Sequence, residues 1–395
     1  MRKHWKSIFI TMILCIALAA ALTGCGGSDS TGGSAAPSGS SSAAEAGSAP
    51  EIPGLTYEST MELKYADQFA VYDYEGGYSL IDIVDEGQFL VVPEDGEVPE
   101  GLSEDITVLQ KPLDRIYLAA TASMALFASM DGTDHIRMSS LQASGWSMDS
   151  VKELMKKGDI IYAGKYSEPD YETMLDEGCN LAIESTMIYH SPEVQEMIED
   201  LGIPVLIDRS SYESNPLGRT EWIKLYATLT DDREAADKFF EGQIEQIKEL
   251  EDFKNTEKTV AYFYISTDGK AIVKSTDDYT PTMIEMAGGR YIFKQLLDET
   301  GKTSIPMSIE KFYDTAADAD IIVYNGSIDS TVKTLEDLKE KDPILKDFKA
   351  VKEGNCYVTG TSMYQRTDLS GEMIMDFHKL VAKDGADMKF ISKLE

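Results

Sequence analysis

The chain has 395 residues, of which 36 are basic and 69 acidic, and its formal net charge is −33. This surplus of acidic residues argues against a nucleic-acid-binding or anionic-lipid-binding protein, because phosphate contacts need a basic face. The length suits two domains rather than one.

Residues 1–24 have the pattern of a secretory signal peptide rather than of a folded segment. Arg2, Lys3 and Lys6 provide a positive start, and an apolar run follows from Ile8 to Leu22. The alternative is an uncleaved membrane helix, which is disfavoured because the run is shorter than the ~20 residues that a bilayer span needs. We therefore predict that this segment is removed from the mature protein.

The signal peptide ends in Leu22-Thr23-Gly24-Cys25, which resembles the lipobox of bacterial lipoproteins. The resemblance implies that Cys25 is acylated, for example with palmitate, and becomes the new N-terminus. The protein is then expected on the outer face of the cell membrane, anchored by lipid. Residues 25–53 are mostly Gly, Ser, Ala and Pro, and they predict a flexible tether because they cannot bury enough apolar surface to offset their ordering entropy.

The segment 55–93 has the alternating pattern of β-strands. FAVYDYEGGYSLIDIV contains two alternating runs around Glu75-Gly76-Gly77, which is a hairpin signal, and GQFLVVP adds a third strand. We place this β-rich segment at the start of an N-terminal lobe, 54–229. The sequence assigns no function to it.

From Arg115 onward, short apolar strands alternate with helices. In the N-terminal lobe we predict strands at RIYLA, DIIYA, NLAIE and IPVLID, and helices around 121–130, 169–175, 192–201 and 217–229. In a C-terminal lobe, 254–395, we predict strands at KTVAYFYI, ADIIVYNG and GNCYVTG, and helices at TPTMIEMAG, SIEKFYDTA and DLSGEMIMDFHKLVA. This alternation predicts an α/β fold with parallel sheets covered by helices on both faces.

The segment 230–253 lies between the two halves and is predicted to form one connecting helix. Thr230 and Asp231 can cap its first backbone amides, and Gly242 is its weak point, costing ~1 kcal/mol against alanine. Its apolar stripe consists of Ala236, Phe240, Ile244 and Ile247. Periodicity alone would also fit an ordinary surface helix, and its position favours a connector. Because ligands bind beyond the carboxyl ends of parallel strands, we expect the ligand site in the cleft between the lobes.

The four cysteines do not form a disulfide framework. Cys15 leaves with the signal peptide and Cys25 carries lipid, while Cys179 and Cys356 fall on opposite sides of the connecting helix. A disulfide between the last two is therefore not expected, and both are interpreted as small buried hydrophobic residues.

Catalytic and metal-binding motifs are absent from the sequence. His135, His190 and His378 show no close ligand spacing and there is no CxxC, which argues against a site for a bare metal ion. GxSxG, Walker and HExxH motifs are also missing. We therefore expect a binding protein rather than an enzyme, with no cofactor apart from a bound ligand.

Several segments resemble, in their order and spacing, the substrate-binding lipoproteins of ABC importers for ferric siderophores, haem and cobalamin. The resemblance runs from about Arg115 to the C-terminus, and the β-rich segment 55–93 departs from it. It implies two Rossmann-like lobes joined by one long α-helix, with an ABC permease dimer and its ATPase as partners. The segments are ASGWSMDSVKEL, YAGKYSEPDYETMLDEGCNLAIES, PLGRTEWIKLYATL, TPTMIEMAGGRYIF, MSIEKFYDTAADADIIVYNG and SMYQR.

The same resemblance implies a permease-docking role for Glu172 and Glu310. Each begins a helix shortly before an apolar strand, one in each lobe, and in relatives one exposed glutamate per lobe pairs with permease arginines. Two fixed carboxylates can set the docking register through bidentate arginine contacts. The alternative is that both are ordinary first-turn glutamates, favoured there by the helix dipole.

Seven residues resemble the family's ligand-binding positions. Large aromatic faces suit a corrin, porphyrin or catecholate surface, and a guanidinium suits carboxylate or catecholate charge. The seven are Thr121, Trp146, Tyr166, Tyr189, Tyr279, Tyr364 and Arg366. His190, Arg209 and Tyr212 also follow strands and could reach the cleft. For haem, Met187, Tyr189 and His190 are the candidate axial ligands, and simple strand-end packing is the alternative.

The sequence thus predicts a surface lipoprotein of a Gram-positive-like bacterium that captures a small-molecule metal complex for import. A ferric siderophore is the first choice of ligand, and cobalamin and haem are the alternatives. A surface glycoside hydrolase using Glu172 and Glu310 is a distant alternative, because the resemblance places both on the outer surface. A continuous connecting helix should restrict the lobes to small movements.

Overall fold

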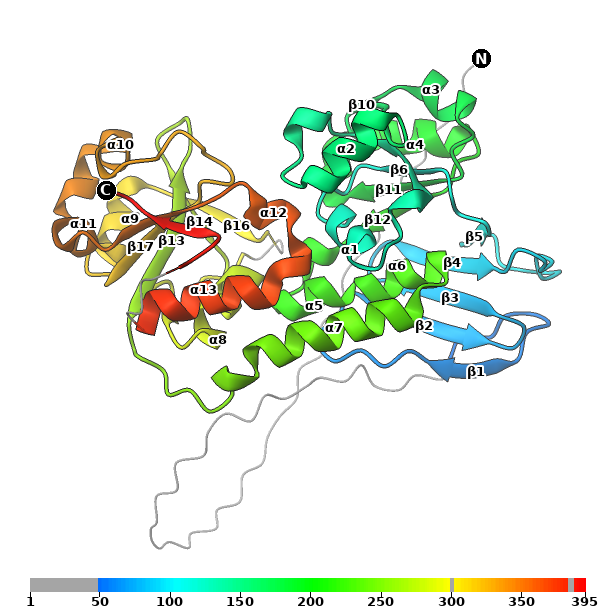
Figure 1. The fold of residues 1–395 in the computed structure, drawn as a ribbon, viewed down its shortest axis with the longest axis horizontal. Helices are drawn as coiled ribbons and strands as arrows, with labels where there is room; N and C mark the ends of the chain where they lie inside the picture. Colours follow the sequence, from blue (N-terminus) through cyan, green and yellow to red (C-terminus); the bar gives the residue numbers. More distant parts are fainter. Residues whose placement is uncertain (1–48, 299–301, 383–386) are drawn as a thin grey trace, which may run out of the picture. The chain divides into compact units, whose positions relative to one another are not determined.

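The computed structural model describes residues 49–298, 302–382 and 387–395 (Figure 1). Ser48–Glu395 forms one compact unit. The predicted signal peptide, Cys25 and most of the predicted tether lie outside the described residues. Within the described ranges, no helix is both long enough and apolar enough to cross a bilayer.

A five-stranded sheet opens the described part of the chain (Figure 1). Its order is β1-β2-β3-β4-β5, with β1 to β4 antiparallel and β5 parallel to β4. The predicted hairpin is present, and Gly76 and Gly77 adopt the positive φ angles that its turn requires. The sheet extends beyond the predicted segment 55–93 to Gln110. The strands are β1 (Tyr57–Thr60), β2 (Phe69–Tyr74), β3 (Tyr78–Ile83), β4 (Gly87–Val92) and β5 (Ile106–Gln110).

Both faces of this N-terminal sheet are apolar. Along β4, Phe89 and Val91 join the main hydrophobic core, whereas Leu90 and Val92 pack in a separate cluster with Ile52. This division follows from the alternation of side chains along a strand. One face therefore packs onto the rest of the protein, and the preceding residues contribute to covering the other.

The first lobe is built on a parallel sheet of order β12-β11-β6-β7-β8. Its α1 contributes Phe127 to the main core on one face, while α3 and α4 contribute Met174 and Ile198 to the cluster on the other. The predicted strand–helix alternation is confirmed, with β7 as an additional strand. The elements are β6 (Ile116–Leu118), α1 (Met124–Ser129), β7 (Ile136–Ser139), α2 (Asp149–Lys157), β8 (Ile161–Tyr162), β9 (Gly164–Lys165), β10 (Glu168–Pro169), α3 (Tyr171–Asp176), β11 (Leu181–Ser185), α4 (Pro192–Asp200) and β12 (Val205–Asp208).

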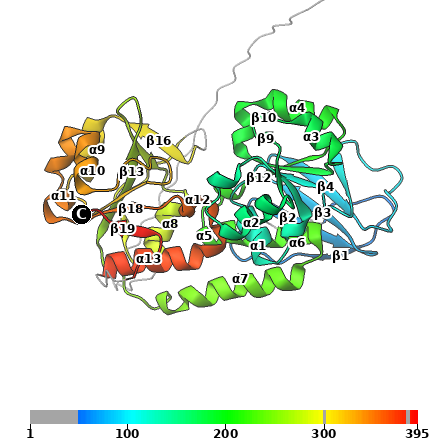
Figure 2. The same cartoon turned by 45° about the horizontal axis from the view of Figure 1, so that its top comes forward.

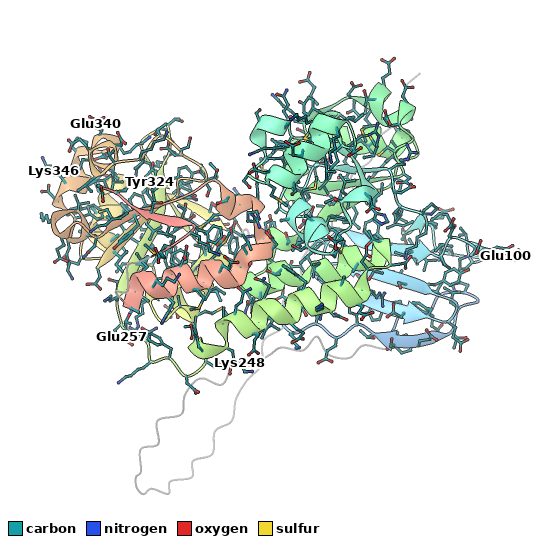
Figure 3. The ribbon with its side chains drawn as sticks, viewed as in Figure 1. Glu100, Lys248, Glu257, Tyr324, Glu340 and Lys346 are labelled. Carbon is teal, nitrogen blue, oxygen red and sulfur yellow. The ribbon has the colours of Figure 1, made fainter. Side chains whose placement is uncertain are left out.

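The second lobe has a mixed sheet of order β16-β14-β13-β17-β18-β19, with β15 paired to β13. The strands β15, β13, β17 and β18 are parallel, as predicted, but β14, β16 and β19 run antiparallel to their neighbours. The turn Ser266–Lys270, with Gly269 at φ 77°, reverses the chain after β13 and so makes a hairpin instead of a helical crossover. Tyr324 at the end of β17 is buried, whereas charged residues such as Glu340 lie at the periphery (Figure 3).

The two cysteines among the described residues are free thiols, and Cys356 is buried as predicted, whereas Cys179 is only partly buried. The strands are β13 (Thr259–Ile265), β14 (Ala271–Lys274), β15 (Arg290–Tyr291), β16 (Ser304–Met307), β17 (Ile321–Tyr324), β18 (Cys356–Thr359) and β19 (Ile391–Lys393). The helices are α8 (Tyr279–Met286), α9 (Ile309–Ala316), α10 (Leu335–Lys341), α11 (Lys349–Glu353), α12 (Ser362–Gln365) and α13 (Ser370–Ala382).

Three consecutive helices, α5 (Pro216–Glu221), α6 (Ile223–Thr230) and α7 (Arg233–Ile247), connect the lobes. The helix predicted over 230–253 is therefore shorter at both ends, and a 3-10 turn, Lys248–Leu250, extends it. The expected capping by Thr230 and Asp231 is wrong. The chain before them is already helical, and Asp231 takes a left-handed φ of 67° that separates α6 from α7. Within its bounds α7 is continuous (Figures 1 and 2).

The second lobe attaches to α7 through α13, which lies alongside it (Figures 1 and 2). The buried face of α7 includes Ala236, Phe240 and Ile247 from the predicted stripe, and also Gln243. The side chain of Gln243 accepts a hydrogen bond of 3.2 Å from the backbone amide of Gly371. This contact supplies a partner to the first turn of α13, whose amides have none within their own helix.

Two buried glutamates fasten the N-terminal sheet to α5. Glu221 accepts hydrogen bonds of 2.8–3.0 Å from three consecutive backbone amides, 64–66, and pairs with Lys224 at 2.9 Å. Glu213 accepts from the next two amides, 67 and 68, and from the indole of Trp222. The backbone between β1 and β2 is thus held at five successive residues.

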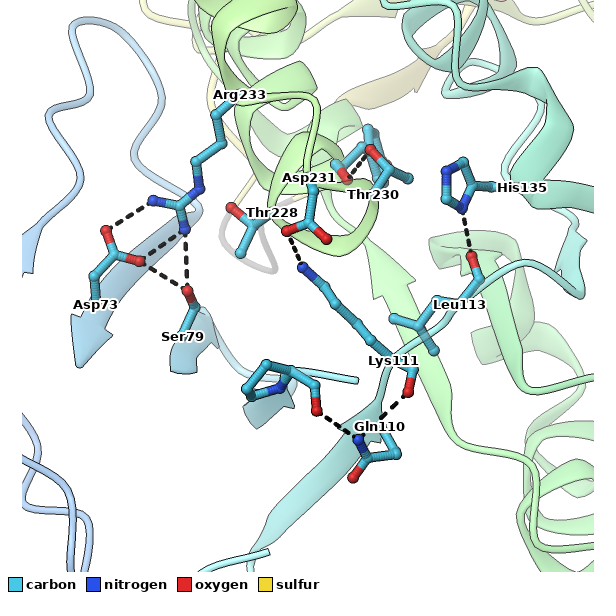
Figure 4. Close-up of polar contacts among 12 residues, drawn as sticks. Asp73, Ser79, Gln110, Lys111, Leu113, His135, Thr228, Thr230, Asp231 and Arg233 are labelled. Carbon is cyan, nitrogen blue, oxygen red and sulfur yellow. Dashed lines mark hydrogen bonds and ion pairs between the residues drawn. The ribbon is translucent and has the colours of Figure 1, made fainter. Parts of the chain in front are cut away.

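Further ion pairs join the same sheet to the start of α7 (Figure 4). Arg233 makes a bidentate contact with Asp73, at 2.7 and 2.8 Å, and reaches Ser79 at 3.1 Å. Lys111 pairs with Asp231 at 2.5 Å. The sheet, the first lobe and the α5–α7 helices are therefore tied together by specific contacts.

Gly242 and Gly371 provide a matched test of the α7–α13 contact. A methyl group at Gly242 meets nothing within 4 Å, so Gly242→Ala should stabilise the protein by ~1 kcal/mol through helix propensity. A methyl group at Gly371 would lie 3.0 Å from the backbone oxygen of Gln243, so Gly371→Ala should destabilise it by roughly 1–3 kcal/mol. Urea unfolding measures both, and equal effects of the two substitutions would contradict the close helix contact.

Candidate functional site

The loop after β7 places Trp146 where the two lobes meet. A 3-10 turn, Ala143–Gly145, precedes it, and the indole is 2% exposed. Gln365 in α12 of the second lobe accepts a hydrogen bond of 2.7 Å from the amide of Ser147 and donates one of 2.8 Å to the carbonyl of Gly145. The side-chain amide of Gln365 therefore bonds to the residues before and after Trp146, and these two bonds join the lobes.

Two hydrogen-bonding groups at this loop are buried without a partner among the described residues. They are Trp146 Nε1 and Ser147 Oγ. A buried polar group left unpaired costs about 1–3 kcal/mol, so such groups are uncommon unless something else binds them. The loop that Gln365 contacts therefore carries two hydrogen-bonding groups without a partner among the described residues.

On the second lobe, Tyr279 begins α8 and is almost fully buried. The preceding Asp278 caps this helix by accepting from Thr280 N at 2.8 Å, and it pairs with buried Lys274 at 2.9 Å. Burial disfavours the charged form of Lys274, but Asp278 outweighs this effect, and the pKa of the ammonium is raised. This ion pair is consequently neutral as a unit.

Arg219 in α5 lies against Tyr279, with the guanidinium carbon 4.0 Å from the ring centroid. The arginine is 5% exposed. Its remaining contact is a long hydrogen bond of 3.5 Å from Nη2 to Thr367 Oγ1, and Nε has no partner. Within the described ranges, no carboxylate lies at ion-pair distance from it. Arg219 is thus a buried cation without a counter-ion.

Tyr364 and Arg366 lie on either side of Gln365, at the end of α12. Tyr364 is 37% exposed, and burial raises the pKa of its phenol while the nearby charges of Lys274 and Arg219 lower it. The guanidinium of Arg366 is already engaged by Asp368 through two hydrogen bonds of 2.7 and 2.8 Å. Contacts of this stretch therefore bring Trp146, Tyr279, Tyr364 and Arg366 to one junction.

The other predicted ligand residues of the first lobe lie elsewhere. Thr121 is half-buried in the turn before α1, and Tyr166 packs in the β9–β10 turn against the cluster that α3 and α4 cover. The hydroxyl of Tyr189 hydrogen-bonds to Glu86, in the turn between β3 and β4. The assignment of these three residues to the ligand site stays a prediction.

The further candidates near Tyr189 also face the N-terminal sheet or solvent. Arg209 pairs with Asp85 and Glu86 at 3.4 Å and stacks on the ring of Tyr212. Met187 and His190 are exposed. The contacts of Tyr189 and Arg209 favour a role in holding the β3–β4 turn over a role in the cleft.

Arg219 and Gln365 are absent from the residues that the sequence predicts for the site. A signal for Arg219 is visible in PLGRTEWIKLYATL, where charged residues interrupt a largely apolar helix that is buried along its whole length. Gln365 gives no comparable signal, because an amide in a short polar stretch is usually exposed.

The first lobe also buries a carboxyl group with no partner. Glu184 on β11 is 0% exposed, and neither of its oxygens has a hydrogen-bond partner among the described residues. It shares the α3–α4 face with Ala182, two residues before it. Burial raises the pKa of Glu184 to about 8.

Two surface hollows lie away from the junction of the lobes. One of about 480 Å³ lies beside α8, and one of about 420 Å³ lies between the N-terminal sheet and the α6–α7 helices. Neither is lined by Trp146 or Tyr364. The Gln365 contacts hold the lobes together at the junction, and an open cleft there stays a prediction. The described residues contain no group of three or more side chains able to hold a metal ion.

A family model described as "Periplasmic binding protein" matches residues 137–362 of the chain. An uncharacterized lipoprotein of Methanocaldococcus jannaschii is 26% identical over 394 residues, covering 94% of this chain and 92% of the relative. A second uncharacterized lipoprotein of that organism is 24% identical over 411 residues, covering 99% and 100%.

Solved structures share the fold of the chain. A possible iron-binding (periplasmic solute-binding) protein from Staphylococcus epidermidis has a TM-score of 0.53 at 16% identity, covering 69% of this chain and 99% of the other. A periplasmic heme binding protein of Vibrio cholerae has a TM-score of 0.53 at 17% identity, covering 66% and 97%. An Fe3+-hydroxamate transport protein of Saccharomonospora viridis has a TM-score of 0.52 at 15% identity, covering 68% and 93%. This chain therefore carries residues beyond the shared fold.

The buried carboxyl of Glu184 should make stability depend on pH. Its pKa is raised on folding, so the folded state holds a proton that the unfolded state releases, and stability falls as pH rises from about 4.5 to about 8. The slope is at most about 1.4 kcal/mol per pH unit. Glu184→Gln should remove this component and stabilise the protein at pH 8, as measured by urea unfolding at several pH values. Exposed Glu196→Gln is the control, and an equal change in both variants would contradict the effect.

Removing the Gln365 side chain should expose the amide that it caps. In Gln365→Ala the amide of Ser147 loses its acceptor, so its hydrogen exchange should accelerate at least ~10-fold, as read by NMR. The amide of Ser191, which donates to the carbonyl of Ile188 at 2.8 Å in the same lobe, should exchange at its original rate. Unchanged protection of Ser147 would mean that the lobes do not hold this contact in solution.

Proposed function

Because the chain belongs to the periplasmic binding protein family, we propose that it captures an iron complex between its lobes and delivers it to an ABC permease. The observation that carries the proposal is the junction where Gln365, next to Tyr364, joins the Trp146 loop to the second lobe, and where Tyr279 stacks on buried Arg219. Large aromatic faces and an unpaired guanidinium suit a flat or bulky anionic complex better than a bare ion.

A ferric siderophore is the first choice of ligand, and haem is the second. One similar structure is an Fe3+-hydroxamate transport protein and another is a heme binding protein, which supports both choices at the level of ligand class. Cobalamin is a further alternative, on the resemblance that the sequence shows to this class of importer. All three are bulky metal complexes that a site between two lobes can enclose.

No observation favours the glycoside hydrolase alternative. A glycosidase needs its two carboxyl groups within roughly 10 Å of each other. Glu172 lies in the first turn of α3 and Glu310 in the first turn of α9, and these helices belong to different lobes (Figures 1 and 2). The family is one of substrate-binding proteins, which act with a permease and its ATPase.

The same two glutamates are proposed as the permease-docking contacts. Both are exposed, and each follows a capped helix start, at Asp170 in α3 and at Ser308 in α9. A carboxylate in a rigid first turn has a fixed position, which suits it to bidentate pairing with an arginine of the permease.

A lipid anchor at Cys25 is the proposed mode of attachment to the outer face of the cell membrane. It is supported by the Leu22-Thr23-Gly24-Cys25 sequence and by the names of the two Methanocaldococcus jannaschii relatives, which are both lipoproteins. The tether would let the folded unit reach its permease while staying near the membrane.

Charge reversal at the two docking positions tests the function. The double variant Glu172→Lys/Glu310→Lys should bind the ligand as the wild type does, because both residues lie on the surface away from the junction, but it should abolish uptake by cells. Glu196→Lys on α4 is the matched control and should leave uptake intact. Binding is measured on purified protein by tryptophan fluorescence against ferric siderophores, haemin and cyanocobalamin. If none of these binds, the proposed function is wrong, and normal uptake by the double variant would remove only the docking assignment.

A further inference from the structure

We propose that Arg219 binds an anionic group of the ligand, so that the protein selects metal complexes carrying carboxylate or catecholate oxygens over neutral ones. The inference rests on the proposed function and narrows it. It assigns the choice of ligand to a residue of α5, a helix between the lobes, and not to the strand-end loops of either lobe.

The other two basic side chains at the junction each have a carboxylate partner, whereas Arg219 has none within ion-pair distance among the described residues. Lys274 is paired with Asp278 at 2.9 Å, and Arg366 is paired with Asp368 at 2.7 Å. Both pairs are neutral as units, whereas no described carboxylate reaches Arg219. Arg219 is therefore the basic side chain of this junction that is left to pair with an anion from outside the described residues.

Burial without a counter-ion is costly for a guanidinium, because the low-dielectric surroundings replace water that would solvate the charge. The ring of Tyr279 offsets part of this cost by a cation–π contact at 4.0 Å. The guanidinium is weakly hydrogen-bonded to the described residues, since the bond to Thr367 is 3.5 Å long and the buried Nε has no partner. An anion would supply both the missing charge and the missing acceptor.

The neighbouring unpaired groups are hydrogen-bond donors, like the guanidinium of Arg219. The Nε1–H of Trp146 can only donate, and the hydroxyl of Ser147 can donate as well. Both belong to the loop that Gln365 holds, and Gln365 is separated by only one residue from Thr367, the contact of Arg219. Unpaired donors on the Trp146 loop and on Arg219 match a ligand rich in acceptor oxygens.

Access to Arg219 lies along the same stretch. Tyr364 is partly exposed and near enough to Arg219 for the two groups to act on each other electrostatically. Opening the junction there would need α12 to move with loss of the two Gln365 hydrogen bonds, while the bonds from Thr220 of α5 to Thr367 and Ser370 hold the chain that follows. The anion then replaces contacts that the lobes make with each other.

The test compares anionic and neutral complexes on purified wild type and variants. Haemin and a ferric tris-catecholate are the anionic probes, and ferrichrome and cyanocobalamin are the neutral ones, all measured by isothermal titration calorimetry. Arg219→Met removes the charge at similar volume, and Arg219→Lys keeps the charge but loses the planar fork. Arg290→Met is the matched control, because Arg290 is a more exposed arginine of the second lobe that pairs with Glu257 at 2.9 Å.

We expect the wild type to bind at least one anionic probe more than ~10-fold more tightly than the neutral ones. Arg219→Met should weaken that binding by about 10- to 100-fold, the size of a charge-assisted hydrogen bond, and Arg219→Lys should fall between the two. Binding by Arg290→Met should equal that of the wild type. The melting temperature of unliganded Arg219→Met should not fall, because an uncompensated buried charge has been removed.

Two results would overturn the inference while the proposed function stands. One is wild-type binding of a neutral probe as tight as that of the anionic probes. The other is a uniform loss of affinity and of melting temperature in Arg219→Met, which is the signature of a purely structural arginine. If the wild type binds no probe at all, the proposed function fails and the inference fails with it.

Discussion

The two buried glutamates, one before α5 and one at its last residue, are the constraint on which the arrangement of this protein depends. Glu221 and Glu213 together hold five consecutive backbone amides of the segment between β1 and β2. An amide left unpaired in that setting would be costly, so the N-terminal sheet cannot slide on the helix without losing several hydrogen bonds together. The sheet, the first lobe and the α5–α6 helices are consequently one mechanical body.

The second lobe is attached to this body by contacts of a different kind. Its α13 packs on α7 across Gly371 and Gln243, and its α12 reaches the first lobe through the side chain of Gln365. Thr220 of α5 adds buried hydrogen bonds to the carbonyl of Thr367 and the hydroxyl of Ser370, at 2.9 and 2.8 Å. These contacts are a close helix packing and hydrogen bonds that involve no carboxylate. The part of the site that Tyr279 and Tyr364 provide therefore belongs to the lobe that is attached without buried carboxylates, and Arg219 belongs to the body that the two glutamates hold together.

Local patterns in the sequence carry most of the fold and only part of the site. Strand–helix alternation and the Gly76-Gly77 turn are local signals, and the corresponding elements are present. The break at Asp231 was not foreseeable from periodicity, because it depends on α6 packing ahead of it, and the antiparallel edge strands are too short to show a pattern. The roles of Arg219 and Gln365 depend on partners far away in the sequence, and a local sequence pattern cannot predict such contacts.

The different attachment of the two lobes has a consequence for how a membrane partner could sense an occupied protein. The N-terminal sheet holds the first lobe against the connecting helices, so α3 and Glu172 should keep their position when a ligand enters. Only α9 and Glu310, in the second lobe, should then shift. The distance between Glu172 and Glu310 would then change with ligand binding, because only one of the two glutamates moves. A permease that binds both glutamates would then detect a bound ligand from the displacement of Glu310 alone.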